Sequence, residues 1–327
     1  MSSGSVRLHD LHPAADRMLD DVVRGLSSVP RSLPPKYFYD AAGAALFEQI
    51  TTLPEYYPTC TELEILERYD SDIAAAIPAA AHLIEFGSGS GLKTRLLLRA
   101  LDTAVAYSPI DISRRQLIDF STDVAAEFPA LQVLPVCADY TQTVTLPEPD
   151  TPPTARVAFF PGSSIGNFQP LEAAAFLRRV RSLCGDSGGL LIGVDQEKDT
   201  AVLERAYNDE AGVTAAFNLN MLVRLNRELG ADFDLTAFRH HAFYDEGDHR
   251  IEMRLLCTRP CTVTIPNPTG GPAWTFGFEA GDHITTEYSY KYSRDGFEEM
   301  VAGAGWRAAR YWTDDRSWFG VWLLEAG

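Results

Sequence analysis

The sequence predicts an α/β protein in which helices cover both faces of a mainly parallel sheet, together with a second lobe of α+β type. Apolar strand-like segments alternate with helix-like periodic segments between residues 82 and 194. A glycine-rich turn joins the first of these strands to the helix that follows. The alternation ends after Asp195 and gives way to helical and then strand-like patterns. Because ligands bind at the carboxyl ends of parallel strands, we expect the main site at that edge of the sheet.

The elements of the predicted sheet follow one another in a regular order. Residues 1–10 are expected to be frayed, and helical spacing is expected over 14–26, around Phe47 and over 63–73. Strands are expected at 82–86, 105–110, 131–136, 156–161 and 188–194, alternating with helices at 92–102, 113–127 and 170–184. A helix at 296–304 and two strands at 307–312 and 320–324 are expected to complete this sheet.

The region after Asp195 has a different pattern. Helices are expected between 200 and 229, followed by strands near 250–256, 262–265 and 274–278 and a Pro/Gly-rich turn at 266–272. The 327 residues are enough for two domains of moderate size. We therefore predict one domain over 61–196 and 292–327, and a second lobe over 10–60 and 197–291 that covers the strand ends.

The glycine-rich turn predicts a ligand that contains adenosine. The segment Glu85-Phe-Gly-Ser-Gly-Ser-Gly91 follows a strand and precedes a helix, so backbone N–H groups can approach an anion at the helix N-terminus. The next strand ends in Asp111, where nucleotide-binding folds place a carboxylate for ribose hydroxyls. The third strand ends in Asp139-Tyr140, a second acid beside an aromatic ring.

Three adenosine ligands compete for this pattern. A P-loop for ATP requires glycine where Leu92 stands, and a dinucleotide motif requires its third glycine one residue later than Gly91. S-adenosylmethionine enzymes carry an acid followed by a looser G-x-G-x-G, as found here. Taken alone, the glycines also fit an ordinary tight strand-to-helix turn. With Asp111 and Asp139 added, the pattern favours a Rossmann-like class I methyltransferase sheet that binds S-adenosylmethionine.

Composition excludes several other classes of protein. The formal net charge is −17 without a basic stripe, which disfavours nucleic-acid binding and suits solubility. The five cysteines are scattered and form no zinc motif, so we expect no bound metal. We expect the thiols to be free, as in a cytoplasmic protein. No apolar run reaches about 18 residues and no signal peptide is evident, so we expect no membrane association. We also expect a monomer without an obligate protein partner.

Several further segments resemble one enzyme family, the histidine Nα-trimethyltransferases of ergothioneine biosynthesis, which convert histidine to hercynine. Besides the glycine-rich turn, the matching segments are 32–40, 53–59, 162–167, 206–209, 212–218, 250–253 and 286–291. Tyr37, Arg254 and Tyr140 depart from the Trp, Trp and Phe found in members of that family. None of these departures removes a polar group that the chemistry requires. Because some relatives act on other amino acids, the resemblance fixes the reaction type more firmly than the substrate.

The resemblance implies roles for the cofactor-binding residues. Lys93 is expected to pair with the methionyl carboxylate, although a solvated helix lysine is the alternative. Asp111 is expected to accept hydrogen bonds from the ribose diol, with a helix N-cap as the alternative. Asp139 is expected to bind the adenine amino group, Tyr140 to cover the ring, and Gly87 to allow close backbone approach.

The resemblance also implies an amino-acid site. Asn167 and Tyr207 are expected to hold the α-carboxylate as neutral groups, without a positive charge that competes beside the sulfonium; Asn167 alternatively belongs to a turn. Glu287 and Ser289 are two residues apart, so on a strand they face one side and can bind both imidazole nitrogens; an exposed strand end is the alternative. Tyr56 resembles the family's third imidazole contact.

Four further side chains complete the expected pocket. Met253 packs against the imidazole or fills the core. Tyr39, Phe47 and Phe217 present ring faces to sulfonium and quaternary ammonium groups, although Phe217 suits core packing equally well. The implied chemistry is three in-line methyl transfers to a neutral amine, driven by positioning, with the proton leaving through water or Tyr39.

Two other functions remain open at this point. A methyltransferase for another substrate, such as tryptophan or a protein side chain, would keep the cofactor site and lose the imidazole contacts. A non-catalytic adenosyl-binding regulator would lose Asn167, Tyr207 and Glu287, and all three are present.

Overall fold

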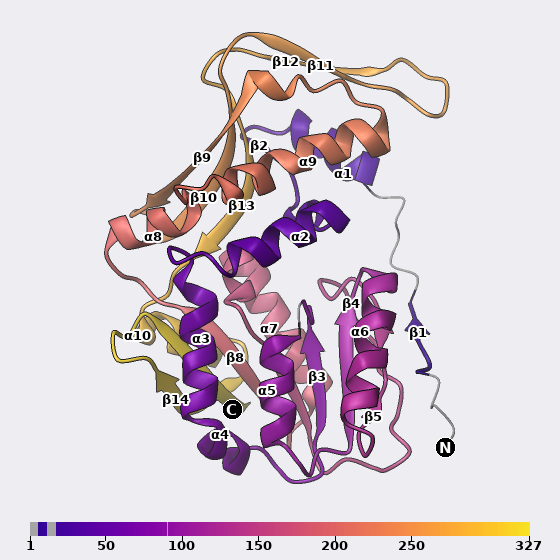
Figure 1. Ribbon diagram of the computed structural model, residues 1–327, viewed down its shortest axis with the longest axis vertical. Helices are drawn as coiled ribbons and strands as arrows, with labels where there is room; N and C mark the ends of the chain where they lie inside the picture. The colour runs from indigo at the N-terminus through magenta and orange to yellow at the C-terminus, as the bar shows by residue number, and fades with distance from the viewer. Residues whose placement is uncertain (1–5, 12–17, 90) are drawn as a thin grey trace. The chain divides into compact units, whose positions relative to one another are not determined.

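The computed structural model describes residues 6–11, 18–89 and 91–327, and the chain divides by its contacts into two compact units (Figure 1). Unit 1 comprises Met1–Pro13, Thr61–Gln196 and Tyr292–Gly327, and unit 2 comprises Ala14–Cys60 and Glu197–Lys291. Unit 1 therefore contains the predicted alternating region, and unit 2 contains most of the chain before and after it.

Unit 1 is built on a nine-stranded sheet with the order β1-β6-β4-β3-β7-β8-β15-β14, and β5 pairs with β4. Its strands are β1 (His9–Asp10), β3 (His82–Phe86), β4 (Ala106–Asp111), β5 (Gln132–Val133), β6 (Val136–Cys137), β7 (Arg156–Phe160), β8 (Gly189–Asp195), β14 (Trp306–Thr313) and β15 (Phe319–Ala326). Strands β1 to β8 of this sheet pair in parallel, whereas β15 is antiparallel to both β8 and β14.

Helices cover both faces of this sheet. They are α3 (Tyr57–Arg68), α4 (Asp70–Ala76), α5 (Leu92–Ala100), α6 (Arg114–Glu127), α7 (Pro170–Cys184) and α10 (Arg294–Gly303). Alternate residues of β3 enter opposite cores: Ile84 joins the side chains of α7 and α10, and Leu83 joins those of α3 to α6. The predicted α/β class with helices on both faces is therefore confirmed.

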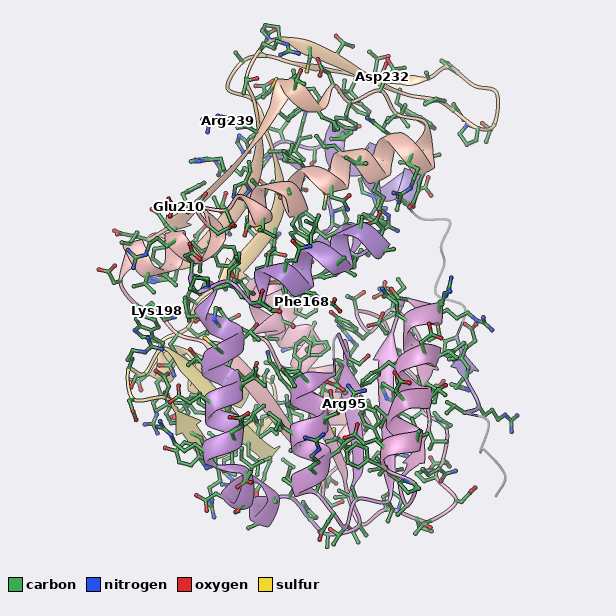
Figure 2. The ribbon with its side chains drawn as sticks, viewed as in Figure 1. Arg95, Phe168, Lys198, Glu210, Asp232 and Arg239 are labelled. Atoms are coloured by element: carbon green, nitrogen blue, oxygen red, sulfur yellow. The ribbon has the colours of Figure 1, made fainter. Side chains whose placement is uncertain are left out.

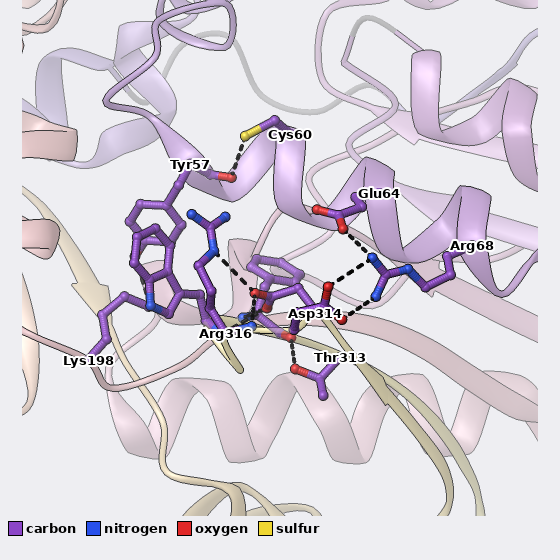
Figure 3. Close-up of polar contacts among 11 residues, drawn as sticks. Tyr57, Cys60, Glu64, Arg68, Lys198, Thr313, Asp314 and Arg316 are labelled. Carbon is purple, nitrogen blue, oxygen red and sulfur yellow. Dashed lines mark hydrogen bonds and ion pairs between the residues drawn. The ribbon is translucent and has the colours of Figure 1, made fainter.

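Ion pairs on the helix surfaces join neighbouring turns and elements of unit 1. Arg95 of α5, labelled in Figure 2, lies 2.9 Å from Glu127 at the end of α6. In Figure 3, Arg68 at the end of α3 contacts Glu64 one turn earlier, at 2.6 Å. Such exposed pairs contribute at most about 1 kcal/mol each.

Unit 2 consists of helices packed on a four-stranded sheet, and it also contains a separate two-stranded sheet. Its elements are α1 (Met18–Ser27), β2 (Arg31–Ser32), η2 (Pro35–Phe38), α2 (Ala41–Ile50), α8 (Thr200–Tyr207), α9 (Val213–Leu229), η4 (Leu235–Ala237), β9 (Phe238–Asp245), β10 (Arg250–Cys257), β11 (Cys261–Ile265), β12 (Trp274–Phe278) and β13 (His283–Tyr290). The larger sheet has the order β2-β13-β10-β9, and β11 pairs with β12. Helices α8 and α9 pack on the larger sheet (Figure 1).

Strand β13 contains one residue more than its partner β10 at a β-bulge. Met253 pairs with Glu287, but the next residue of β10, Arg254, pairs with Thr285. Thr286 is therefore the extra residue. Its hydroxyl donates to Asn218 Oδ1 at 2.8 Å and to the Met253 carbonyl at 3.1 Å, which fixes the bulge against α9.

Several boundaries differ from the sequence prediction. The helix expected over 63–73 is two helices that break at Tyr69, and the helical region 200–229 breaks before Gly212, which has φ of +74°. The strand expected over 131–136 is divided into β5 and β6 around Pro135, which lacks a backbone donor. Residues 9–10, expected to be frayed, form β1. The start of the first predicted helix, residues 14–17, lies outside the described residues.

The rest of the described chain adds two observations. Strand β9 was not expected, because its sequence mixes histidines and an arginine with apolar residues. None of the helices in the described ranges combines the length and the apolar character that crossing a membrane requires.

Candidate active site

The glycine-rich turn of unit 1 has the backbone geometry of a close-approach site. Gly87, Gly89 and Gly91 have φ of +75°, +49° and +70°, a region that side chains strongly disfavour. A Cβ at Gly91 would also lie 2.0 Å from Cε2 of Phe120. Glycine is therefore required where β3 turns into α5, and the first N–H groups of α5 are presented at the carboxyl end of the sheet. Ser90 lies outside the described residues.

The two predicted acids lie at the ends of neighbouring strands. Asp111 is the last residue of β4, and its Oδ1 accepts from the Ser113 N–H at 2.8 Å. Burial raises the pKa of Asp111. Ser113, not Asp111, occupies the N-cap position of α6, so the N-cap alternative is wrong. Asp139 follows β6, and its Oδ1 accepts from the Thr141 N–H and hydroxyl at 2.9 and 2.6 Å. Both carboxylates are thus fixed by short turns.

Tyr140 lies in an aromatic cluster of unit 1. Its ring packs edge-on against Phe86, Phe160 and Phe176, with centroids 6.1, 6.0 and 6.1 Å away. Burial raises the pKa of its phenol. The ring also lines a cavity of about 360 Å³ between α7 and residues 142–144. Tyr140 is therefore part of the core on the α7 side of the sheet, and its role toward adenine stays a prediction.

Lys93 is held by a carboxylate that was not expected from the sequence, that of Glu62. Its Nζ pairs with Oε2 of Glu62, a side chain only 1% exposed, and that oxygen also accepts from the Gly162 N–H at 2.8 Å. A Cβ at Gly193 would lie 1.9 Å from the other oxygen of Glu62, so this carboxylate needs a glycine beneath it in β8. Lys93 is not a solvated helix lysine, because its position is set by a buried partner.

Glu85, the acid of the glycine motif, is buried and accepts hydrogen bonds from two side chains. The Thr94 hydroxyl donates to both carboxylate oxygens at 2.7 and 2.8 Å, and the Tyr107 hydroxyl donates to Oε2. Burial raises the pKa of Glu85 to about 8. This acid therefore supports the strand-to-helix turn from within the protein core.

Asn167 belongs to unit 1 and ends a short 3₁₀ helix, η3 (Ser164–Asn167). The preceding Ser163 has φ of +56°, and its hydroxyl accepts from the Asp195 N–H at 2.9 Å. Phe168, labelled in Figure 2, follows directly. The loop that carries Asn167 begins at Gly162, whose N–H is bound by Glu62. The same buried carboxylate therefore positions both Lys93 and the start of this loop.

In unit 2, Tyr207 and Ser289 meet in a hydrogen-bonded group that also contains Lys291. The Tyr207 hydroxyl donates to Ser289 Oγ at 2.8 Å. Lys291 Nζ donates to Ser289 Oγ at 2.8 Å and to the Tyr207 hydroxyl at 3.2 Å. Lys291 is 2% exposed and Ser289 is 4% exposed. The amino group of Lys291 is thus within hydrogen-bond distance of the Tyr207 phenol.

Lys291 corrects the expectation that the carboxylate site is free of positive charge. Tyr207 was expected to be a neutral ligand for that reason, but Lys291 Nζ donates to its hydroxyl at 3.2 Å. Lys291 was missed, although it continues the two-residue spacing of Glu287 and Ser289. Extending that alternation by one step would have found it.

Glu287 lies on the same strand, opposite the buried Met253 in β10. Burial raises the pKa of Glu287 to about 7, and the charge of Lys291 acts in the opposite direction. Glu287 is partly buried, so it is not the exposed strand end considered as an alternative. Its carboxyl group therefore titrates close to neutral pH.

The predicted aromatic residues form one continuous group in unit 2. The ring centroids lie 5.7 Å apart for Tyr39–Phe47, 5.9 Å for Tyr39–Phe217 and Phe47–Phe217, 6.3 Å for Phe47–Tyr56 and 6.2 Å for Tyr56–Tyr207. Phe217 also stacks on Phe38 at 4.4 Å and is buried, so it belongs to the core as well as to this group. Tyr39 is 37% exposed, which suits contact with a ligand.

Comparison with known proteins assigns these two sets of residues to one family. The family model described as histidine-specific methyltransferase, SAM-dependent, matches residues 18–326. The chain belongs to this family. It is 41% identical over 314 residues to histidine N-alpha-methyltransferase of Mycolicibacterium smegmatis, covering 95% of each chain. It is 40% identical to the Mycobacterium tuberculosis protein of the same name, covering 93% of each.

Two other relatives indicate how far the similarity extends. Ergothioneine biosynthesis protein 1 of Neurospora crassa is 32% identical over 90% of this chain, which matches only 33% of that longer protein. The 4-dimethylallyltryptophan N-methyltransferase of Epichloe festucae var. lolii is 26% identical, covering 92% of each chain. The wider set of relatives therefore includes a protein named for an indole substrate.

Family membership makes the protein an S-adenosylmethionine-dependent N-methyltransferase. The residues of unit 1 fit that cofactor: they offer backbone donors at α5, one cation at Lys93, and two carboxylates at strand ends, Asp111 and Asp139. The description of the family names S-adenosylmethionine, the cofactor that the glycine spacing favoured. Among the described residues, no group of three or more metal-ligating side chains is present.

Proposed function

We propose that this protein trimethylates the α-amino group of L-histidine to give hercynine, the first step of ergothioneine biosynthesis. The observation that carries the proposal is the pair of polar groups on β13, where Ser289 bonds to Tyr207 and Glu287 lies two residues before Ser289. A carboxylate and a hydroxyl spaced along one strand face suit the two nitrogens of an imidazole ring. The names of the similar mycobacterial proteins support the same substrate.

Unit 1 is proposed to hold S-adenosylmethionine, which supplies an electrophilic methyl group when bound. Lys93 would bind the methionyl carboxylate, with its position fixed by Glu62. Asp111 would accept from the ribose hydroxyls and Asp139 from the adenine amino group. Gly87 would allow the backbone to approach closely. Tyr140 would cover the adenine ring, and Asn167 would hold the α-carboxylate of the amino acid.

Unit 2 is proposed to hold the amino acid. Glu287 would accept from the imidazole N–H, Ser289 would bind the other ring nitrogen, and Tyr56 would be a third contact. Tyr207 would bind the α-carboxylate, and Met253 would pack against the ring. Anchoring at both ends leaves the α-amine free to rotate, so one site can serve the mono-, di- and trimethylated states.

The aromatic group would stabilise the charge that builds up on the amine. Each methyl transfer leaves an ammonium, and the third leaves a permanent cation, which ring faces attract. Tyr39 is the proposed route for the departing proton, directly or through water. Its partial exposure allows that proton to reach solvent.

The second candidate is methylation of a larger aromatic amino acid, favoured by the similarity to the tryptophan-derivative enzyme. An indole offers one N–H and no ring acceptor, so it would leave one polar group of β13 unpaired. Sites built to hydrogen-bond a ring nitrogen reject rings that lack it by a large factor. We therefore place histidine first.

A methyl-transfer assay over the twenty free amino acids tests the proposal. We expect mass spectrometry to detect the successive addition of three methyl groups to histidine. Histamine, which lacks the carboxylate, should be a very poor substrate. Preferred methylation of tryptophan, or equal turnover of histamine and histidine, would overturn the assignment. The cytoplasmic location and monomeric state stay predictions.

A further inference from the structure

We infer that His240 is a positioning residue: its Nε2–H holds the carbonyl group of Tyr207 and thereby sets the separation of the two groups that anchor the amino acid. The inference deepens the proposed function and rests on it, because Tyr207 and Glu287 are anchors only in that proposal. His240 itself is proposed to touch neither the amino acid nor the cofactor.

The first step is the orientation of the Asn218 side chain on α9. Its amide nitrogen lies 3.1 Å from the Arg254 carbonyl, and a carbonyl oxygen can only accept. The atom at this position is therefore the NH₂ group, and the amide oxygen faces Thr286. The Thr286 hydroxyl lies 2.8 Å from that oxygen and donates to it. Asn218 is completely buried, so these contacts define a single orientation of the amide.

The second step is the position of the proton on His240 of β9. Its Nδ1 lies 2.9 Å from the same NH₂ group of Asn218, which has a second hydrogen to donate and cannot accept. Nδ1 is therefore unprotonated, and the single proton of the neutral ring is on Nε2. Burial lowers the pKa of His240, which favours the neutral ring. Nε2–H then donates to the Tyr207 carbonyl at 2.8 Å.

The third step is what this bond does for Tyr207, the last residue of α8 (Figure 1). Carbonyl groups in the last turn of a helix need partners from outside it, and His240 supplies one. Asn218 in turn holds β13 at Thr286. A path of hydrogen bonds thus joins the end of α8 to Thr286, the residue before Glu287.

This path uses none of the groups that the amino acid is proposed to bind. The hydroxyl proton of Tyr207 bonds to Ser289 in the structure, but a bound α-carboxylate needs the same proton. That bond is therefore lost when the amino acid binds, whereas the bond from His240 goes to the backbone of Tyr207 and is kept. The carboxylate anchor and the ring anchor then stay at one separation. A substrate whose ring and carboxylate are farther apart should fit poorly.

The test measures how strongly the site discriminates by length. Homohistidine has the imidazole, amine and carboxylate of histidine and one more methylene group in its side chain. Wild type should bind histidine about 10- to 200-fold more tightly than homohistidine, the range expected for one methylene group in a fitted pocket. In His240→Phe, which removes both ring nitrogens, the anchors can move apart and this ratio should fall to about threefold or less. Titration calorimetry with S-adenosylhomocysteine present measures both dissociation constants.

Two variants control for a general loss of structure. His240→Gln places an amide NH₂ group near the position of Nε2, so it should retain most of the wild-type ratio by keeping the donor. His241→Phe makes the same change one residue later, where the side chain lies on the opposite face of β9, and it should keep the full ratio. If His240→Phe does not fold, Thr286→Val removes the hydroxyl donor to Asn218 at nearly constant volume and should lower the ratio instead.

The position of the proton is tested separately by NMR. In protein labelled with ¹⁵N in its histidines, wild type should show a neutral ring protonated at Nε2 whose signal is absent from His240→Gln. A His240 signal from a ring protonated at Nδ1, or at both nitrogens near neutral pH, would contradict the second step.

The outcomes separate the inference from the proposed function. Failure of wild type to bind or methylate histidine would overturn both. Histidine methylation with an unchanged histidine-to-homohistidine ratio in folded His240→Phe, or in Thr286→Val where that variant replaces it, would overturn the inference alone. Equal binding of the two compounds by wild type would do the same. A fall in the ratio in His241→Phe as large as in His240→Phe would also contradict it, because the effect would not depend on the bond to Tyr207.

Discussion

Each unit has a lysine in its candidate site, and the two lysines have different partners. In unit 1, Lys93 pairs with the carboxylate of Glu62, so its charge is balanced by a full opposite charge. In unit 2, Lys291 donates to the hydroxyls of Tyr207 and Ser289, and it acts on Glu287 through the low-dielectric interior. Lys93 therefore has a carboxylate as its partner, whereas Lys291 joins two hydroxyl groups.

The two candidate sites also differ in how far apart their residues lie in the sequence. The turn from Glu85 to Gly91 brings its groups together within seven residues. The hydrogen bond from Tyr207 to Ser289 joins residues 82 positions apart, on α8 and β13. A local turn should tolerate changes in other elements, whereas a network between elements should respond to each of its members. Four predictions test this contrast, from the largest expected effect to the smallest.

The largest effect is expected for Glu287→Ala. The wild-type enzyme should prefer histidine over phenylalanine or tryptophan by a factor on the order of 10³ or more. Removing the carboxylate takes away the ring acceptor and enlarges the pocket, so this preference should fall sharply while S-adenosylmethionine affinity stays constant. Adding Met253→Ala should extend the shift toward larger rings. Competition between paired amino acids measures the ratio.

Glu279→Ala, which removes an exposed acid from the same unit, is the control for this prediction. An unchanged histidine-to-tryptophan ratio in Glu287→Ala would move the specificity determinant to another residue.

A smaller effect is expected for Asp111→Ala in unit 1. Loss of the acceptor leaves ribose hydroxyls unpaired, which costs about 1–3 kcal/mol, or roughly 5- to 150-fold in S-adenosylmethionine affinity. Titration calorimetry measures it directly. Asp119→Ala, at an exposed position of α6, should leave the affinity unchanged. Equal affinities for wild type and Asp111→Ala would remove Asp111 from the site.

The pH dependence of histidine binding is the third prediction. An acid with a pKa raised to about 7 is mostly protonated at pH 6 and mostly ionised at pH 8. Because the ionised carboxylate is the acceptor for the ring N–H, histidine affinity should weaken by up to about tenfold as the pH falls across this range.

Glu287→Gln isolates this contribution, because an amide does not titrate. Calorimetry with histidine and S-adenosylhomocysteine should give a shallower profile for Glu287→Gln, with only the imidazole of the ligand titrating near 6.5. Parallel profiles for the two proteins would show that Glu287 does not bind the ring.

The smallest effect is expected for Arg95→Ala, two residues after Lys93. Its ion pair with Glu127 is partly exposed, so the free energy of unfolding should change by less than about 1 kcal/mol. S-adenosylmethionine affinity should stay within about twofold of wild type. A larger loss of affinity would indicate that charge on α5 acts on the cofactor generally, and not through Lys93 in particular.

The fold was predictable where the sequence pattern of a single helix or strand was enough to identify it. The apolar runs of β3 and β7 and the 3.6-residue spacing of α7 are local properties, and they gave the α/β class. The break at Tyr69 and the strand β9 were not predictable in this way. At Tyr69 the periodicity continues across the break, and in β9 burial alternates less regularly than in an ordinary half-buried strand.

The same distinction explains which site residues were missed. The turn residues and the acid Asp111 follow from spacing along one strand–turn–helix unit. Glu62 becomes recognisable only once α3 is known to pass over Gly193 in β8, a contact between residues far apart in the chain. Lys291 needed the knowledge that the alternation of β13 continues past its last paired residue. In both cases the missing information is tertiary.

The bulge at Thr286 changes which side chains of β13 share a face. Thr285 pairs with Arg254 and Glu287 pairs with Met253, so these two residues of β13 point to opposite faces although they are two positions apart. Deleting Thr286 would leave both pairs in register, and Glu287 would keep its face of the sheet. The deletion would instead remove the hydroxyl that donates to Asn218 of α9, so any loss of histidine recognition should come from a looser contact between β13 and that helix.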